Sequence, residues 1–375
     1  MTEQLQSQRS GASSSLQRQV VVRDRWLRRL LQGQEIVMAL IGIGLAIFFT
    51  LYSSAFGSAD NGPTLANYVA PIMIFAVAEV FVLTLGEIDL SVGQVYVLSP
   101  FLVVYLNNAG LNLIISILIS LVISALIGCF NGLVTVRLRV PSFITTLGTV
   151  FALKGVVLLS SNGIQVNAAG TGTVANVLGG WSFSEILWAL GIAVVCHVVF
   201  RRTSFGLHIT AVGGNQTASG EAGIKVGLVK IWCFVLCAFL GGLMGILDGY
   251  HIGSLNPGTD GLTLMFYGVA AAVIGGTALT GGRGTMIGAA IGAIVLGVLE
   301  DGFNIIGVNA FAYQLVLGLA ILGAMILNVQ LERVRSGRVE GRGSFARLLM
   351  RIGGTRTQRR AGQAADRPNG GSDQQ

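Results

Sequence analysis

The chain has 375 residues, of which 53% are hydrophobic and only 11% are charged, with a net charge of +7 and a mean hydropathy of +0.73. A soluble domain carries about 25% charged residues, so this composition excludes that class and predicts an all-α, polytopic membrane helical bundle. The positive charge does not indicate nucleic-acid binding, because the basic residues fall in the terminal segments and in short loops between apolar runs.

The two ends of the chain differ from its body. Residues 1–34 are polar and rich in arginine, with neither the apolar run near the start nor the cleavage site of a signal peptide, so they are predicted to form a basic cytoplasmic leader. Residues 329–375 are basic and have little to bury, which predicts a disordered cytoplasmic tail.

Between these segments lies one predicted membrane domain, residues 35–328, with about ten spanning helices. Most of its apolar stretches are close to the ~20 residues that a helix needs to cross the hydrocarbon layer. In chain order the predicted spans are 35–54, 67–85, 91–106, 111–133, 142–159, 183–200, 231–250, 264–279, 285–299 and 311–328.

The basic residues predict the orientation of these spans. If the leader is inside, all of the 24 Lys and Arg residues except Lys154 lie in the leader, the tail or the inside loops, which are 134–141, 201–230 and 280–284. Cationic loops stay on the cytoplasmic side, so both termini are predicted to be cytoplasmic. Lys154, near the outer end of its span, can reach the interface by snorkelling.

The second and third spans are joined by LTLGEIDLSVG, Leu83 to Gly93, without a true loop. Carboxylates inside a bilayer cost a few kcal/mol, so Glu87 and Asp89 must face protein, water or the interface. Asp89 or Ser91 is expected to cap the next helix, which predicts a broken-helix junction formed by Glu87, Asp89 and Ser91. A simple capping role for Asp89 and a role in a path through the membrane both remain open.

The stretch 201–230 is the one long charged insert between apolar runs in the body of the chain. A helix is expected only from about Gln216 to Ile224, with Asn215 as its N-cap and Gly223 near its end. The insert is either a solvated linker or a surface on which a cytoplasmic partner docks.

The cysteine, histidine and glycine residues do not indicate a catalytic or metal-binding site. The four cysteines fall inside predicted spans and the three histidines are scattered, so neither a disulfide nor a metal site is predicted. The glycine repeat Gly284, Gly288 and Gly292 predicts close helix packing. The chain contains no phosphate-binding loop, so it is not expected to bind ATP itself.

Four motifs resemble the permease subunits of ribose-type carbohydrate ABC importers, in the branched-chain amino-acid/monosaccharide permease superfamily. They are GEIDLSVG at 86–93, VPSFITTLGT at 140–149, AVGGNQTAS at 211–219 followed by GIKV at 223–226, and VIGGTALTGGRGT at 273–285. The resemblance covers roughly residues 35–328, in the family's order and spacing. Glu87 departs from it, because the family usually has Gly there, and so does the pair Gly220-Glu221.

The resemblance implies a permease of about ten helices in the bacterial cytoplasmic (inner) membrane, which imports a monosaccharide or related polyol. Its partners would be an ABC ATPase subunit, an extracytoplasmic sugar-binding protein and a second permease copy or paralogue. ATP and Mg would be bound by the ATPase, which alone would be the enzyme, and this chain would bind no cofactor directly. The family's ATPase-docking helix corresponds here to Asn215, Ala218, Ser219, Gly220, Glu221, Gly223 and Ile224.

A neutral, hydroxyl-rich solute would need sparse polar and aromatic groups along its path. Such groups in the second, third, fifth and eighth spans are Glu79, Tyr96, Thr146 and Tyr267. A nucleoside or branched-chain amino-acid ABC permease is the nearest alternative function. An ion-coupled secondary transporter is a further one, although it would need more buried ionisable residues at a shared site.

Overall fold

The computed structural model describes residues 34–309 except residue 171, together with isolated positions between 312 and 326. The predicted leader and tail, and most of the predicted tenth span, lie outside the described residues. The described part is helical apart from one pair of two-residue strands, so the prediction of an all-α membrane bundle is confirmed.

Each of the first nine predicted spans corresponds to one helix. These helices are α2 (Gln34–Tyr52), α3 (Gly62–Leu83), α4 (Val92–Asn108), α5 (Leu113–Arg137), α6 (Ser142–Ser161), α8 (Ser184–Arg202), α11 (Val226–Ile252), α12 (Gly261–Ile274) and α13 (Met286–Ile305). The shorter elements are η1 (Ala59–Asn61), α7 (Thr173–Ala175), the π-helical turn η2 (Asn176–Gly180), α9 (Ser204–Gly214) and α10 (Gln216–Glu221). Strands β1 (Val166–Asn167) and β2 (Ser254–Leu255) pair in antiparallel register.

Among the described residues, seven helices are long and apolar enough to cross a membrane, and α4 and α12 are not among them. With 17 and 14 residues, these two helices are about 26 and 21 Å long, less than the ~30 Å thickness of the hydrocarbon layer. The structure thus supports a membrane bundle with seven full-length helices and two shorter ones, which is a coarser result than the ten spans predicted.

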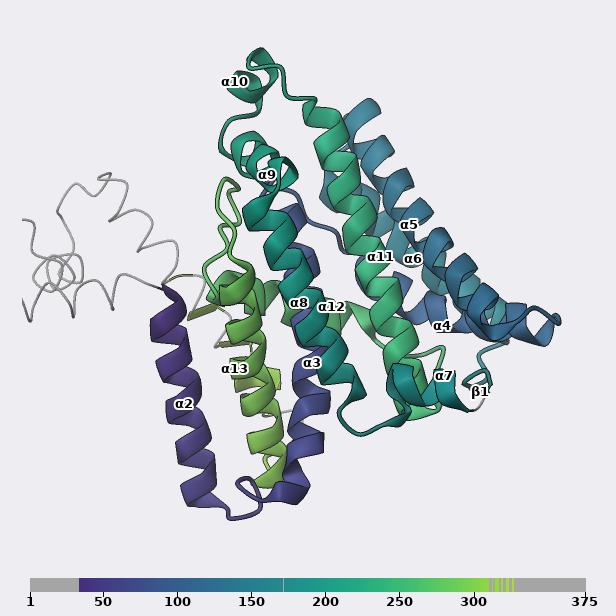
Figure 1. Cartoon of the computed structure of the whole chain (residues 1–375), viewed down its shortest axis with the longest axis vertical. Helices are drawn as coiled ribbons and strands as arrows, with labels where there is room; N and C mark the ends of the chain where they lie inside the picture. The colour runs from purple at the N-terminus through teal and green to yellow at the C-terminus, as the bar shows by residue number, and fades with distance from the viewer. Residues whose placement is uncertain are drawn as a thin grey trace, which may run out of the picture. The chain divides into compact units, whose positions relative to one another are not determined.

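The middle of the bundle is formed by α3, the junction that follows it and α4, where nearly every residue from 69 to 99 is buried. Helices α2 and α13 pack at one edge, and α5 and α6 lie at the opposite edge (Figure 1). Large apolar side chains such as Leu118 on α5, Phe151 on α6 and Val194 on α8 remain exposed. A membrane protein covers such faces with lipid or with another subunit.

Helices α4 and α12 begin inside the bundle, where their first residues meet. A Cβ atom on Gly93 would overlap the Gly261 carbonyl group, and one on Gly261 would overlap the Gly93 carbonyl group, so only glycine allows this approach. Val92 lies against Gly241, more than halfway along α11. The non-helical backbone before each helix therefore runs through protein rather than lipid, the setting in which irregular backbone is tolerated at membrane depth.

The loops lie at two opposite ends of the bundle. Helices α9 and α10 lie at one end, and β1 and α7 lie at the other (Figure 1). Helix α9 corrects the expectation that only residues 216–224 of the insert are helical. Its glycines lower its intrinsic helix propensity, but Gly206 lets it pack directly against the Phe200 carbonyl of α8, and Ile209 and Val212 are buried.

Candidate functional site

Three of the motifs meet at the backbone of Thr84, just after α3 ends. The Gly282 amide donates to the Thr84 carbonyl at 2.8 Å. A Cβ on Gly213, near the end of α9, would overlap the same carbonyl oxygen. The end of α9, the junction after α3 and the loop before α13 are thus in direct backbone contact.

Helix α10 begins as predicted, because the Asn215 Oδ1 accepts the Ala218 amide at 3.0 Å. It ends at Glu221 rather than near Ile224, since Gly223 adopts a positive φ of 87° that closes the turn. The predicted docking residues divide into two groups. Ser219 is buried and Ile224 is half-buried against the core, whereas the exposed ones are Asn215, Ala218, Gly220, Glu221 and Gly223.

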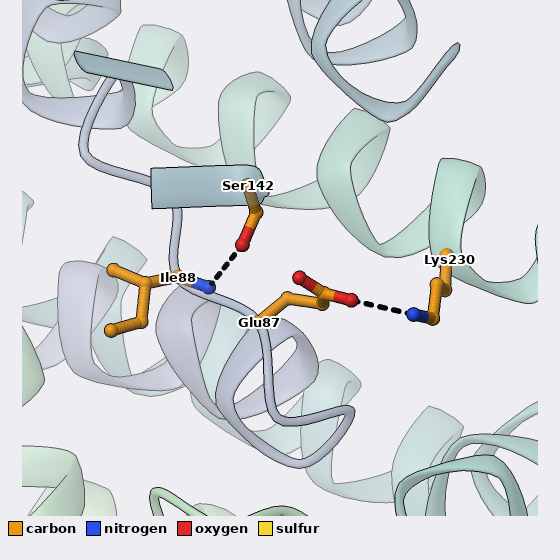
Figure 2. A network of polar contacts seen from close by, with 4 residues as sticks. All are labelled: Glu87, Ile88, Ser142 and Lys230. Atoms are coloured by element: carbon orange, nitrogen blue, oxygen red, sulfur yellow. Dashed lines mark hydrogen bonds and ion pairs between the residues drawn. The ribbon is translucent and has the colours of Figure 1, made fainter. Parts of the chain in front are cut away.

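The junction is tied to two further helices near the same end (Figure 2). The Lys230 Nζ, in the second turn of α11, donates to the Glu87 Oε1 at 2.5 Å, and the two side chains retain only 12% and 15% of their exposure. The Ile88 amide donates to the Ser142 Oγ at 3.3 Å, at the start of α6. Glu87, the residue that departs from the family motif, therefore links the junction to the helix that follows the insert.

Asp89 organises the beginning of α4. Its Oδ1 accepts both the Ser91 amide at 2.9 Å and the Ser91 hydroxyl at 2.6 Å. The Asn131 amide group donates to the Ser91 Oγ at 2.7 Å, and the Thr149 hydroxyl donates to the Asn131 Oδ1 at 2.6 Å. Motif VPSFITTLGT thus joins the junction through a continuous polar chain.

The four predicted path residues are in different surroundings. Glu79 is fully enclosed beside Cys237, whose Sγ lies 3.8 Å from the Glu79 Oε1, and it lies within electrostatic range of Asp89. The buried Thr146 hydroxyl donates to the Ser142 carbonyl of its own helix at 2.8 Å. Tyr267 is half-buried against the core.

Tyr96, the fourth predicted path residue, donates its hydroxyl to the Asp248 carboxylate of α11, and its ring meets Phe75 at a centroid distance of 5.7 Å. Sequence reasoning missed Asp248 and Asn131, although each is a polar residue inside an apolar stretch, a pattern that indicates function in membrane helices. It also counted Lys230 only as an inside cation and did not foresee its partner. Among the described residues, no group of three or more His, Cys, Asp and Glu residues could hold a metal ion.

The sequence is similar to proteins of known function. The xylose/arabinose import permease protein XylH of Sulfolobus acidocaldarius is 34% identical over 312 residues, which are 80% of this chain and 86% of that protein. The ribose import permease protein RbsC of Escherichia coli K12 is 32% identical, covering 80% of this chain and 94% of the relative. RbsC of Bacillus subtilis 168 is 33% identical, covering 76% and 89%.

No solved structure matches the chain. Residues 63–329, which include all four motifs that meet around the junction, match the family described as branched-chain amino acid transport system / permease component. Because this match extends over most of the chain and the relatives align over almost their whole length, the protein belongs to that permease family.

Proposed function

We propose that this chain is the membrane-spanning permease subunit of an ATP-driven ABC importer for a monosaccharide or related polyol. The observation that carries the proposal is the exposed helix α10, joined through α9 and the junction to the centre of a membrane bundle. The named relatives support the substrate class, because they are import permeases for ribose and for xylose/arabinose. A further relative, from Azospirillum brasilense, is an L-arabinose ABC transporter permease protein.

The mechanism follows from the contacts around Thr84. A partner ATPase that closes on ATP and Mg would displace α10, and α9 would pass the movement to the Thr84 backbone by direct contact. Packed interiors rearrange between discrete states rather than deforming continuously, so the junction and α4 would shift as a unit and open the path to one side at a time. The chain itself performs no covalent chemistry on the solute.

The complete arrangement has ten spans with both termini in the cytoplasm of a bacterial cell, in its cytoplasmic (inner) membrane. A second permease copy or paralogue would complete the path, and an extracytoplasmic sugar-binding protein would deliver the solute. The loops that lack Lys and Arg would face this binding protein. Glu79, Thr146 and Tyr267 remain candidate path residues together with Tyr96.

Reconstitution tests this function. Proteoliposomes that contain the full chain, its ATPase and its binding protein should take up D-xylose, L-arabinose or D-ribose only when ATP is present on the ATPase side. Uptake of L-leucine or a nucleoside in place of the sugars would show that the chain is a branched-chain amino-acid or nucleoside permease of the same superfamily. Solute uptake without any ATPase, driven by an ion gradient, would reject the importer altogether.

Helix α10 offers a direct test of docking. Ala218→Trp adds bulk to an exposed, small-residue surface outside the bilayer, so the permease should still fold and insert while ATPase capture or solute-stimulated hydrolysis is lost. Glu221→Gln is the matched variant and should have less effect, because an exposed ion pair is worth only about 0–1 kcal/mol. Normal capture and stimulation with Ala218→Trp would show that α10 is a linker.

A further inference from the structure

A cavity of about 50 Å³ lies between α4 and α11, beyond the point where α4 and α12 meet. Tyr96 lines it on the α4 side and Asp248 on the α11 side, and the segment from Ser254 to Thr259 completes its wall. Asn256 at this wall is exposed, and the wall includes β2, which pairs with β1 at the end of the bundle opposite to α10 (Figure 1). The cavity therefore lies towards the predicted outer side of the bundle.

The polar groups of the cavity are suited to hydroxyl groups. The Asp248 Oδ2 accepts the Tyr96 hydroxyl, and the Asp248 side chain is half-buried at the cavity wall. Ser254 and Thr259, which carry hydroxyl groups, also line the cavity. Carboxyl oxygens accept hydrogen bonds, so the cavity holds an acceptor together with residues whose hydroxyl groups both donate and accept.

The remaining lining is apolar and contains no basic residue. Phe101 and Pro100 contribute surfaces against which C–H groups can pack. His251 lies within electrostatic range of Asp248, but its Nδ1 is 3.2 Å from the Gly179 carbonyl and it does not line the cavity. A second carboxylate, Glu185, is buried within electrostatic range of Asp248. An anionic group in the cavity would therefore meet the acidic side chain of Asp248 and no lining cation.

We propose that this cavity is a solute subsite, in which Asp248 and Tyr96 bind two neighbouring hydroxyl groups of a neutral sugar or polyol. The inference rests on the proposed function and adds the position and chemistry of the site. The cavity volume is large enough for a few water molecules, which need about 10–15 Å³ each. It is too small to hold a whole sugar ring. One edge of the sugar fits into the cavity, and its hydroxyl groups replace the water there.

The binding test uses a cysteine at the rim. Thr259→Cys is made in a Cys129→Ser background, since the other three cysteines are buried, and is labelled from outside with a membrane-impermeant maleimide. Saturating D-xylose, L-arabinose or D-ribose should slow the labelling by about threefold or more. The same sugars should not change the labelling of Asn162→Cys, an exposed position beyond the end of α6.

Asp248 and Asp260 provide a matched test and control for the role of the Asp248 carboxyl group. Adding Asp248→Asn, which keeps the shape and an acceptor for Tyr96, should abolish the protection and reduce ATP-driven sugar uptake by about tenfold. Adding Asp260→Asn should leave protection and uptake unchanged, because Asp260 bonds to Thr263 and does not line the cavity. A monodisperse elution profile in size-exclusion chromatography confirms that both variants are folded. Asn256→Ala provides a second substitution of a residue that lines the cavity.

The outcomes separate this inference from the proposed function. Sugar uptake that survives Asp248→Asn, or a wild-type importer whose Thr259→Cys reporter no sugar protects, would overturn the subsite and leave the importer intact. Protection by L-leucine or L-lysine in place of sugars would also overturn it, since the site would then take a zwitterion or a cation. Absence of all ATP-driven sugar uptake would reject the proposed function itself.

Discussion

Asp89 connects the junction to more helices than Glu87 does, the other acidic residue of the junction. Through Ser91 its carboxylate reaches Asn131 on α5 and Thr149 on α6, so one side chain connects the beginning of α4 to two neighbouring helices. All four side chains are buried, where a polar group without its partner costs about 1–3 kcal/mol.

We expect Asp89→Ala to lower both the melting temperature and ATP-driven uptake, because Ser91 loses its acceptor and the start of α4 loosens. The cost should be about 1–3 kcal/mol. Asp89→Asn keeps an acceptor oxygen and should be closer to wild type. Thermal unfolding of the purified variants and uptake in proteoliposomes measure the two effects. An alanine variant that melts and transports like wild type would leave Asp89 without either role.

The Glu87–Lys230 ion pair joins the junction to the start of α11, 143 positions apart in the chain. Removing one partner by Glu87→Gln or Lys230→Met should cost about 1–3 kcal/mol, since the remaining charge loses a largely buried partner. Either substitution should also raise the number of ATP molecules hydrolysed per sugar imported, because the junction would lose its ion pair to α11.

The exchanged pair, Glu87→Lys with Lys230→Glu, tests whether the charges interact. It should recover part of both losses, which a double-mutant cycle on melting temperature and on the ATP-to-sugar ratio measures. Arg137→Gln is the control, because Arg137 is an exposed cation at the end of α5. Additive losses in the cycle would mean that the two residues act independently.

At the scale of elements, the shortness of α4 and α12 is a consequence of where they begin. Each is preceded by non-helical residues and an aspartate, and carboxylates near a helix N-terminus interact favourably with the helix dipole. Asp89 bonds to Ser91, and Asp260 accepts the Thr263 hydroxyl at 2.5 Å. The two helices meet at their beginnings through Gly93 and Gly261, so this contact sets the depth of both.

Gly93→Ala should separate the two helix starts, because its Cβ meets the Gly261 backbone rather than a side chain that can move. Overpacking of this kind costs about 1–3 kcal/mol. Gly148→Ala on α6 is the matched control. It has open space at its Cβ and should be neutral or stabilising by up to about 1 kcal/mol. The melting temperatures of the two variants in detergent test this difference. Equal melting temperatures would contradict the close backbone contact at Gly93.

At the scale of the whole molecule, the prediction concerns which end of the bundle faces the cytoplasm. Cysteines at Asn167 in β1 and Thr217 in α10 occupy exposed positions at opposite ends. A membrane-impermeant reagent added to intact cells should label Asn167→Cys and leave Thr217→Cys unlabelled until the membrane is opened. The reverse pattern would invert the proposed topology.

Hydropathy and charge were sufficient for the class of this protein and for the approximate position of nine helices. Both depend on local composition, because an apolar run of sufficient length must be helical in lipid and cations concentrate on one side of the membrane. The N-cap of α10 was also predictable, since Asn215 bonds to an amide only three residues away. The polar sequence at Glu87, Asp89 and Ser91 indicated a broken helix for the same local reason.

Only the tertiary structure decided what those residues contact. Ser91 meets Asn131, Glu87 meets Lys230 and Tyr96 meets Asp248 across separations of 40 to 152 residues, which no local pattern encodes. Helix α9 escaped prediction because its glycines weaken the local signal and its stability comes from packing on α8. The depth at which α4 and α12 begin is likewise set by a glycine contact between distant segments, and this depth positions the cavity that Tyr96 and Asp248 line.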